Sequence, residues 1–152
     1  MITVSRSTVA LTAAGLALTG IAVAPQLGAA ANARATTHTL KLTAHQSGTH
    51  SLGKTTFAGT DVDRNPTTGA IVGYDAIRGR FNVSTGVVKI DAAVALKGGM
   101  ITAHLTGHGN STTLDGTITG GTGKYSGVTG TIHTTQKSGS SKVTHITLTY
   151  TL

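Results

Sequence analysis

The sequence predicts an all-β fold in which eight antiparallel strands form an up-and-down barrel or a sandwich. Apolar and polar residues alternate in eight segments after residue 35, and none of these segments has a helical period. The connections between them are short and rich in glycine, with 21 Gly but only 2 Pro in 152 residues. The chain has no cysteine, so we expect burial and strand pairing, rather than disulfides, to stabilise the domain.

The first 35 residues are predicted to be a secretory signal peptide, and residues 36–152 a single domain. Arg6 gives a basic start, residues 9–23 are mostly small and apolar, and cleavage motifs of the A-x-A type end at Ala33 and Ala35. We therefore expect cleavage after Ala33 or Ala35 and a secreted, extracellular protein. The alternative is a retained membrane anchor, but the run is shorter than the ~20 apolar residues that a bilayer core requires.

The first half of the domain contains four predicted strands. Residues 38–45 place three apolar residues on one face and polar residues on the other, and residues 54–61 follow a polar loop with Phe57 as their only bulky side chain. Residues 70–81 form a long strand that two glycines interrupt, as expected where a barrel bends. Residues 87–97 have an unbroken apolar face, which predicts a core strand.

The second half contains four more predicted strands. Residues 100–108 alternate isoleucine, alanine and leucine with threonine and histidine. Residues 112–119 lead into a glycine-rich segment, and residues 128–135 leave it. Residues 143–152 close the chain with an apolar face that includes Tyr150.

The glycine-rich segment Thr119–Gly130 reads T-G-G-T-G-K-Y-S-G-V-T-G, with five glycines in twelve positions. Glycine permits positive φ and close backbone approach, so we expect a tight hairpin corner here. The residues assigned to this structural corner are Gly120, Gly121, Gly123 and Tyr125. The spacing fits neither a Walker loop nor a dinucleotide fingerprint, because Tyr125 follows Lys124 and position 126 is serine.

The chain is basic, with 12 Lys and Arg against 5 acids, all aspartates. The basic residues are scattered, which predicts a solvated surface. The alternative is weak attraction to an anionic cell wall. We expect no nucleic-acid binding, because aromatic residues are few and no arginine-rich stripe occurs.

Few kinds of catalytic or metal chemistry are available. The chain has no cysteine and no G-x-S-x-G motif. Residues 61–69 open like a calcium loop, but Pro66 replaces its glycine and Val72 its final glutamate, so we expect a turn. His104 and His108 share a strand face about 13 Å apart at ~3.3 Å per residue, too far to bind one zinc ion. We expect neither a metal nor a cofactor.

The glycine corner also carries a family resemblance. G-G-T-G-K-Y-S-G resembles the G-G-x-G-x-[FY] signature of the allene oxide cyclase and dirigent families, and the likeness extends over Leu40–Leu152 as a matching order of strands and turns. It implies an eight-stranded antiparallel β-barrel of the calycin type with a central lumen, often assembled as a homotrimer. The first predicted strand lacks the glutamate of the cyclases, and Ser126 replaces an arginine of the dirigent proteins, so the families' catalytic residues are not matched.

The resemblance also implies where a ligand binds. The implied ligand-binding residues are Phe57, Asp75, Ile77, His104 and Asp115. An apolar barrel disfavours the charged form of a carboxyl group, which suits a general acid or base, so Asp75 and Asp115 are the candidate catalytic residues. The alternatives for these acids are an exposed position or neutralisation by Arg78 or Arg80.

Three functional hypotheses follow. The first is a secreted barrel that binds an apolar or amphipathic small molecule in its lumen. The second is an isomerase, a cyclase or a dirigent-type template that orients a small molecule for cyclisation or coupling. The third is a basic structural protein associated with the cell wall.

Overall fold

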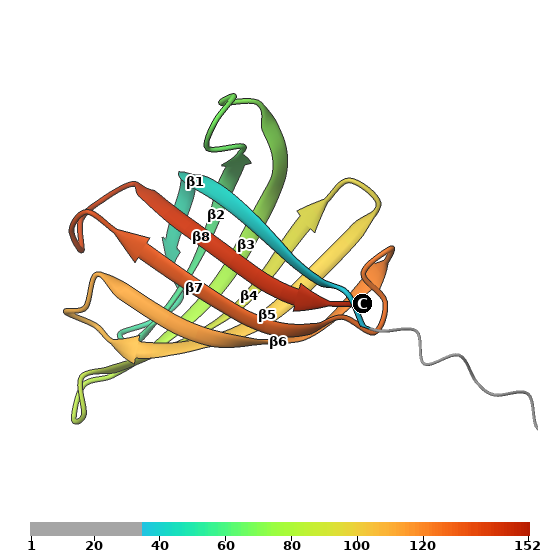
Figure 1. The fold of residues 1–152 in the computed structure, drawn as a ribbon. Coiled ribbons are helices and arrows are strands. Elements are labelled where there is room, and N and C mark those ends of the chain that lie inside the picture. The colour runs from blue at the N-terminus through green and yellow to red at the C-terminus, as the bar shows by residue number, and fades with distance from the viewer. Residues whose placement is uncertain (1–34) are drawn as a thin grey trace, which may run out of the picture. The chain divides into compact units, whose positions relative to one another are not determined.

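The computed structural model describes residues 35–152, which form a closed barrel of eight antiparallel strands (Figure 1). The predicted signal peptide falls, up to residue 34, outside the described residues. Each strand pairs with its neighbours in the sequence, and β8 pairs with β1. The strands are β1 (Thr37–Ser51), β2 (Thr56–Arg64), β3 (Ile71–Asn82), β4 (Val87–Leu96), β5 (Gly99–His108), β6 (Thr113–Gly123), β7 (Thr129–Gln136) and β8 (Val143–Thr151). The part of the chain that the structure describes holds no helix long and apolar enough to span a membrane.

The structure confirms the predicted strands and selects the barrel over the sandwich. The selection rests on the pairing of β1 with β8, which runs without interruption from Thr37 opposite Thr151 to His45 opposite Val143. Closure gives every strand two partners, so no strand edge is left exposed to another chain. Alternate side chains of all eight strands consequently face one shared interior.

β1 and β6 are several residues longer than predicted. β1 continues to Ser51 because a bulge between Gln46 and Gly48 keeps it paired with β2 through the segment predicted to be a loop. β6 continues to Gly123 because residues 120–123 pair with the start of β5. Polar and glycine-rich composition suggested loops at both places, but tertiary pairing overrides that local preference.

The interior is packed solid at the end of the barrel where β1 begins and β8 ends. The largest fully buried side chains there include Leu42, Ile101 and Leu148. Tyr125, from the β6–β7 connection, is only 4% exposed and meets the ring of Tyr150 edge-on, with 6.0 Å between the ring centroids. These residues close this end of the barrel, so any internal space must lie toward the other end.

The β6–β7 connection can hold Tyr125 in place because glycines let the backbones approach closely. Lys124 N donates a hydrogen bond of 2.9 Å to Gly98 O in the adjacent β4–β5 connection. Gly123 has a φ of 60°, and a Cβ atom at Gly121 would lie 2.5 Å from Tyr125 O and 2.8 Å from Met100 O. The connection therefore has no room for side chains at these glycines.

Replacing Gly121 by alanine should destabilise the barrel. The new methyl group would meet two backbone oxygens that cannot move independently, and we expect a loss of about 2–3 kcal/mol in the free energy of unfolding. Gly139→Ala is the matched control, because a Cβ atom there meets nothing within 4 Å. Urea unfolding followed by circular dichroism measures both; equal stability of the two variants would contradict the close approach.

Candidate functional site

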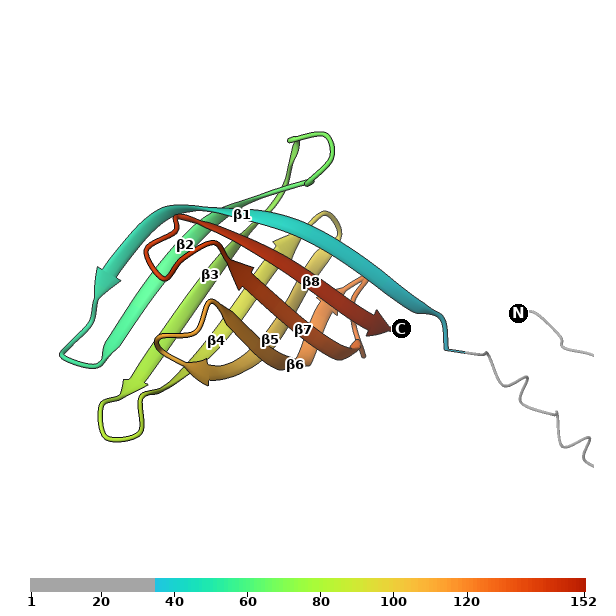
Figure 2. The same cartoon turned by 60° about the vertical axis from the view of Figure 1, so that its left-hand side comes forward.

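A cavity of about 610 Å³ occupies the open half of the barrel. Its rim is formed by Gly109, Ser111 and Thr112 of the β5–β6 connection and by residues 139–142 of the β7–β8 connection. Figure 2 shows that these connections gather with the β1–β2 and β3–β4 connections at the end opposite the β6–β7 connection. We call this end the mouth. A ligand entering there would meet a floor made by the packed closed end.

One wall of the cavity is apolar. Its residues come from β4, β5 and β6, whose inward positions carry aliphatic side chains. They are Val88, Ile90, Ala92, Val94, Leu105 and Leu114. None of these side chains offers a hydrogen bond, so this wall can hold only the apolar part of a ligand.

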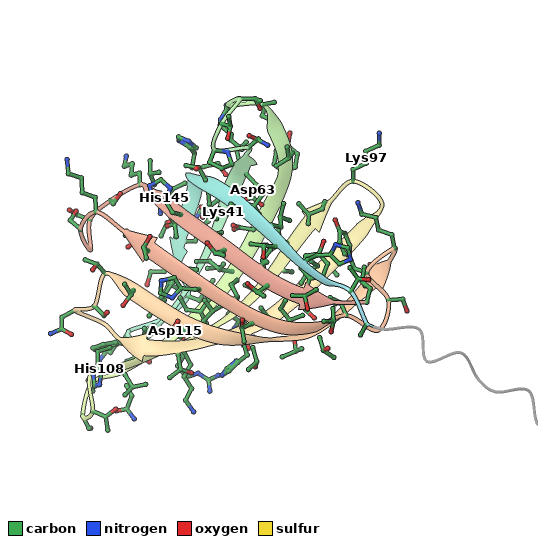
Figure 3. The ribbon with its side chains drawn as sticks, viewed as in Figure 1. Lys41, Asp63, Lys97, His108, Asp115 and His145 are labelled. Atoms are coloured by element: carbon green, nitrogen blue, oxygen red, sulfur yellow. The ribbon has the colours of Figure 1, made fainter. Side chains whose placement is uncertain are left out.

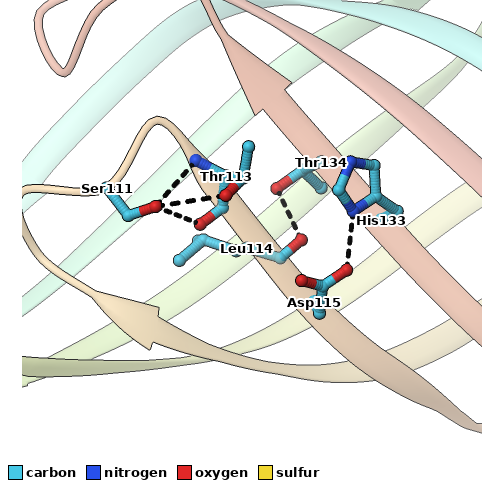
Figure 4. A network of polar contacts seen from close by, with 6 residues as sticks. All are labelled: Ser111, Thr113, Leu114, Asp115, His133 and Thr134. Atoms are coloured by element: carbon cyan, nitrogen blue, oxygen red, sulfur yellow. Dashed lines mark hydrogen bonds and ion pairs between the residues drawn. The ribbon is translucent and has the colours of Figure 1, made fainter.

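The other strands carry most polar groups of the lining, interspersed with apolar side chains such as Phe57, Ile77 and Ile146. We call these polar groups the polar wall. Its residues are Gln46, Thr49, Asp61, Asp75, Thr134, Gln136 and Thr144. Some of these groups already satisfy one another: Gln136 Nε2 donates to Thr144 Oγ1 over 2.8 Å, and Thr134 Oγ1 donates to Leu114 O over 3.4 Å (Figure 4). The cavity is therefore amphipathic: β4, β5 and β6 present almost only apolar side chains, and the polar groups lie mainly on the other strands.

Three aspartates meet where the polar wall reaches the floor. Asp61 lies directly opposite Asp75 in the β2–β3 pairing, and Asp63 is two residues further along the same face of β2, toward the closed end (Figure 3 labels Asp63). Asp75 is 5% exposed and Asp63 0% exposed. We call these three residues the acid cluster. Asp61 and Asp75 line the cavity, and Asp63 lies behind them.

The acid cluster has no basic partner among residues 35–152. The two ion pairs in this part of the chain are elsewhere, and no group outside the cluster donates a hydrogen bond to either oxygen of Asp63 or to Oδ1 of Asp75. Asp63 and Asp75 can hydrogen-bond to each other when one of them is protonated. Most buried polar atoms in proteins are paired, because an unpaired one costs about 1–3 kcal/mol. Stability alone does not account for this arrangement.

Burial is the main cause of the raised pKa values in the acid cluster. Loss of solvation raises the pKa of Asp75 to about 8 and that of Asp63 to about 6, and it also raises the pKa of Asp61. The negative charges of Asp61 and Asp63 raise the pKa of Asp75 further. Near neutral pH, Asp75 therefore keeps a proton that it can donate to Asp63 or to a bound molecule.

The structure places three of the five sequence-predicted ligand residues at the cavity. Phe57, Asp75 and Ile77 all line it. The Phe57 ring lies over Gly79, where a Cβ atom would come within 2.0 Å of it, and the Phe81 ring lies over Gly109 in the same way, at 2.5 Å. Two aromatic rings near the mouth thus occupy space that glycines leave free.

The predictions for Asp115 and His104 were wrong, because both residues lie on the outer face. Asp115 follows the inward-facing Leu114, so strand alternation turns it outward, where its 77% exposed carboxylate pairs with His133 Nδ1 at 2.6 Å (Figure 4). His104 likewise pairs outside with Asp91, Nδ1 to Oδ1, at 2.8 Å. Neither side chain lines the cavity.

The arginines do not neutralise Asp75. Arg78 and Arg80 occupy the alternate positions of β3 and are exposed on its outer face. The predicted ion pair is therefore excluded by the period of the strand, because side chains an odd number of residues apart point to opposite faces. Asp75 stays inside without a counter-charge.

Sequence reasoning missed Asp61 and Asp63. The run of Asp, Asn, Pro and Gly predicted a turn from residue 61, but β2 continues to Arg64 and the turn begins only at Asn65. There the Asn65 Oδ1 accepts hydrogen bonds from the N–H groups of Thr67 and Thr68 at 2.9 and 3.0 Å. The alternation of Phe57 with residues 59, 61 and 63 was the signal that could have placed both acids inside.

The acid cluster is not arranged as a metal site. Among residues 35–152, no group of three or more His, Asp or Glu side chains has the placement needed to hold a metal ion. The D-x-D-x-N run is split between a strand and a turn, so its side chains do not converge as they do in a calcium loop.

Comparison with known proteins supports the fold and goes no further. No family model and no curated protein matches the sequence. Among solved structures, a pterocarpan synthase dirigent protein is 12% identical with a TM-score of 0.67 and covers 89% of this chain and 98% of its own. A pyocyanin demethylase is 20% identical with a TM-score of 0.64 and covers 74% of this chain and 99% of its own.

A third structure is described as a nonspecific heme-binding cyclase that catalyses a [4+2] cycloaddition in neoabyssomicin biosynthesis. It is 13% identical with a TM-score of 0.58 and covers 78% of this chain and 68% of its own. The barrel inferred from the glycine corner is thus the fold of a dirigent protein and of a cyclase. At these identities the likeness concerns the fold alone.

The raised pKa of Asp75 should make the barrel less stable as the pH rises. The folded state holds this proton more tightly than the unfolded chain, so the stabilisation is complete below about pH 4 and is lost as the pH passes about 8. Across that range we expect the free energy of unfolding to fall by at least about 2 kcal/mol. Asp75→Asn should flatten this dependence.

The exposed Asp115 supplies the control for that experiment. Asp115→Asn removes a carboxyl group of the same kind from the outer face and should leave the pH dependence as it is in the parent protein. Urea unfolding at several pH values measures all three proteins. Parallel curves for the parent and Asp75→Asn would refute the assignment.

Proposed function

We propose that this protein binds an amphipathic small molecule in the lumen of its barrel. The observation that carries the proposal is the cavity of about 610 Å³, which is apolar along β4 and has carboxyl groups at its floor that no group outside the acid cluster satisfies. The volume is within the range of about 300–1,000 Å³ typical of small-molecule sites. The similarity in fold to proteins described as a demethylase, a dirigent protein and a cyclase supports the same conclusion.

The two walls define how such a ligand would lie. Its apolar part would contact Val88, Ile90 and Leu114, where each 100 Å² of apolar surface removed from water contributes about 2.5 kcal/mol. Its polar part would reach Asp61 and Asp75 at the floor. Export of the protein, as the N-terminal sequence predicts, belongs to the same proposal and places the ligand outside the cell.

A substitution that fills the lumen should abolish binding. Ala92 points into the cavity, so the indole of Ala92→Trp would occupy ligand space. Ala95→Trp on the exposed face of the same strand is the control. We expect N-phenyl-1-naphthylamine, a neutral dye that fluoresces in apolar sites, to bind the parent and Ala95→Trp saturably with a Kd in the micromolar range, about −8 kcal/mol.

The same titration contains the result that would overturn the proposal. Binding by Ala92→Trp as strong as that of the control would place the dye outside the lumen. Circular dichroism of both variants checks that the barrel is folded. Failure of the parent to bind this or any neutral aromatic probe would contradict an accessible cavity.

Catalysis is the second candidate function, and the state of Asp75 favours it. A carboxyl group whose pKa is raised to about 8 remains protonated at neutral pH and can act as a general acid on a molecule held in the enclosed lumen. The barrel would orient the substrate while Asp75 donates a proton, as a cyclisation or isomerisation template requires.

Mass spectrometry and chiral chromatography would distinguish catalysis from simple binding. The protein is incubated with unsaturated epoxides and polyketide-like polyenes, and the products are compared with those of the uncatalysed reaction. Under the catalytic hypothesis, Asp75→Asn should lower product formation by about 10²-fold or more, whereas Asp115→Asn should not. Unchanged turnover in Asp75→Asn would exclude Asp75 as the acid.

A further inference from the structure

The geometry points to a ligand that carries a positive charge: an amphipathic amine or quaternary ammonium compound whose cationic group sits on Asp61 and Asp75 and whose apolar body lies against β4. This inference rests on the proposed small-molecule function and narrows it to one chemical class. Three observations carry it: the charge of the cluster, its unpartnered atoms and the position of the apolar wall.

No residue that faces the acid cluster compensates its charge. In the strand pairings, the uncharged Gln46 of β1 lies opposite Asp61, and Val94 of β4 lies opposite Asp75. His45, the neighbour of Gln46 on β1, is exposed, and although it lowers the pKa of Asp61, burial outweighs it and the pKa stays raised. The floor of the cavity therefore attracts positive charge.

Two basic residues line the cavity, and both belong to the mouth. His108 ends β5, and Lys142 lies in the β7–β8 connection, where its backbone oxygen accepts a hydrogen bond of 2.9 Å from Gln46 N. The Lys142 residue is exposed and makes no ion pair with the acids, whereas both ion pairs of the described chain involve histidines on the outside. The cluster remains free to pair with a ligand.

The oxygens of Asp63 and Asp75 indicate which chemical group of a ligand would satisfy the acid cluster. Asp75 is more than nine-tenths buried, lines the cavity and has an Oδ1 atom that no group outside the cluster reaches with a donor, and the oxygens of Asp63 behind it also lack a donor from outside the cluster. One proton shared within the cluster can supply a single hydrogen bond. A primary ammonium group has three N–H donors, and a quaternary ammonium group supplies the charge without them.

The apolar wall favours an organic cation over a metal ion as the ligand. The described residues hold no arrangement of acids suited to a metal, and an inorganic ion would leave the wall of Val88, Ile90 and Ala92 in contact with nothing but water. A ligand with a hydrocarbon or aromatic body covers that wall while its charged end reaches the floor. Such a molecule satisfies both the apolar lining and the acid cluster.

Binding of a cation should be linked to release of a proton. A positive charge beside Asp75 favours the ionised form of that carboxyl group. A bound cation therefore replaces the proton that Asp75 otherwise holds near neutral pH. By the same linkage, affinity for a permanent cation should rise as the pH rises from about 6 to about 8.5. A neutral ligand of the same shape should show no such rise.

The experiment compares three probes with one aromatic body. Trimethyl(1-naphthylmethyl)ammonium is a permanent cation, 1-naphthalenemethanol is neutral and 1-naphthoate is an anion. Isothermal titration calorimetry at about pH 8 should show the cation binding at least about tenfold more tightly than the alcohol, and the anion more weakly than both. Calorimetry in two buffers of different ionisation enthalpy measures the proton release.

Variants assign the preference to the acid cluster. The double variant Asp61→Asn/Asp75→Asn should lose at least about tenfold in affinity for the cation while its affinity for the alcohol changes by less than about threefold, which also shows that the lumen is intact. Asp115→Asn on the outer face should behave like the parent. Lys142→Ala should bind the cation more tightly, because it removes a repelling charge from the mouth.

The outcomes separate this inference from the function on which it rests. Equal binding of the cation and the alcohol would overturn the inference and leave the small-molecule function standing. Binding of none of the three probes would overturn both. A cation preference that survives Asp61→Asn/Asp75→Asn would also overturn it, because the charge would then be recognised elsewhere.

Discussion

The hydrogen-bonded pairing of β1 with β8 is the contact on which the rest of this molecule depends. It converts a row of hairpins into a closed surface, so that every second side chain of every strand must share one enclosed space. That space has to be filled, solvated or occupied by a ligand. The environment of each functional group depends on which of these three applies at its level along the barrel axis.

The barrel is filled at one end only. Tyr125 is held by the β6–β7 connection against Tyr150, and aliphatic side chains pack around them. Toward the mouth the inward positions combine glycine and polar residues with larger apolar side chains such as Phe57 and Phe81, and the cavity lies between them. The acid cluster lies at the boundary between these regions, where it is buried enough to lose its hydration and still accessible to a molecule in the lumen.

Period and glycine content sufficed to predict the strands and their order, because each is a local property of the chain. The glycine corner could also be predicted from the sequence, because only glycine fits a backbone approach as close as that at Gly121. The candidate site was harder to predict. The family resemblance placed Asp115 in the lumen, although the side chain that points inward is that of its neighbour Leu114. Composition placed Asp61 and Asp63 in a turn, although both belong to β2. Both errors came from setting aside the strand alternation that the long-range pairing enforces.

The two aromatic rings that lie over glycines near the mouth have an evolutionary consequence. In each pair, Phe57 with Gly79 and Phe81 with Gly109, the aromatic ring fills the space that the facing glycine leaves free. The backbone hydrogen bonds beneath the rings do not depend on which residue of a pair has the large side chain. Reciprocal substitutions within each pair would redraw the entrance while the ladder of the barrel stays the same. Such a change needs both replacements of a pair, because a side chain at Gly79 or Gly109 collides with the facing ring and the loss of the ring alone leaves a void.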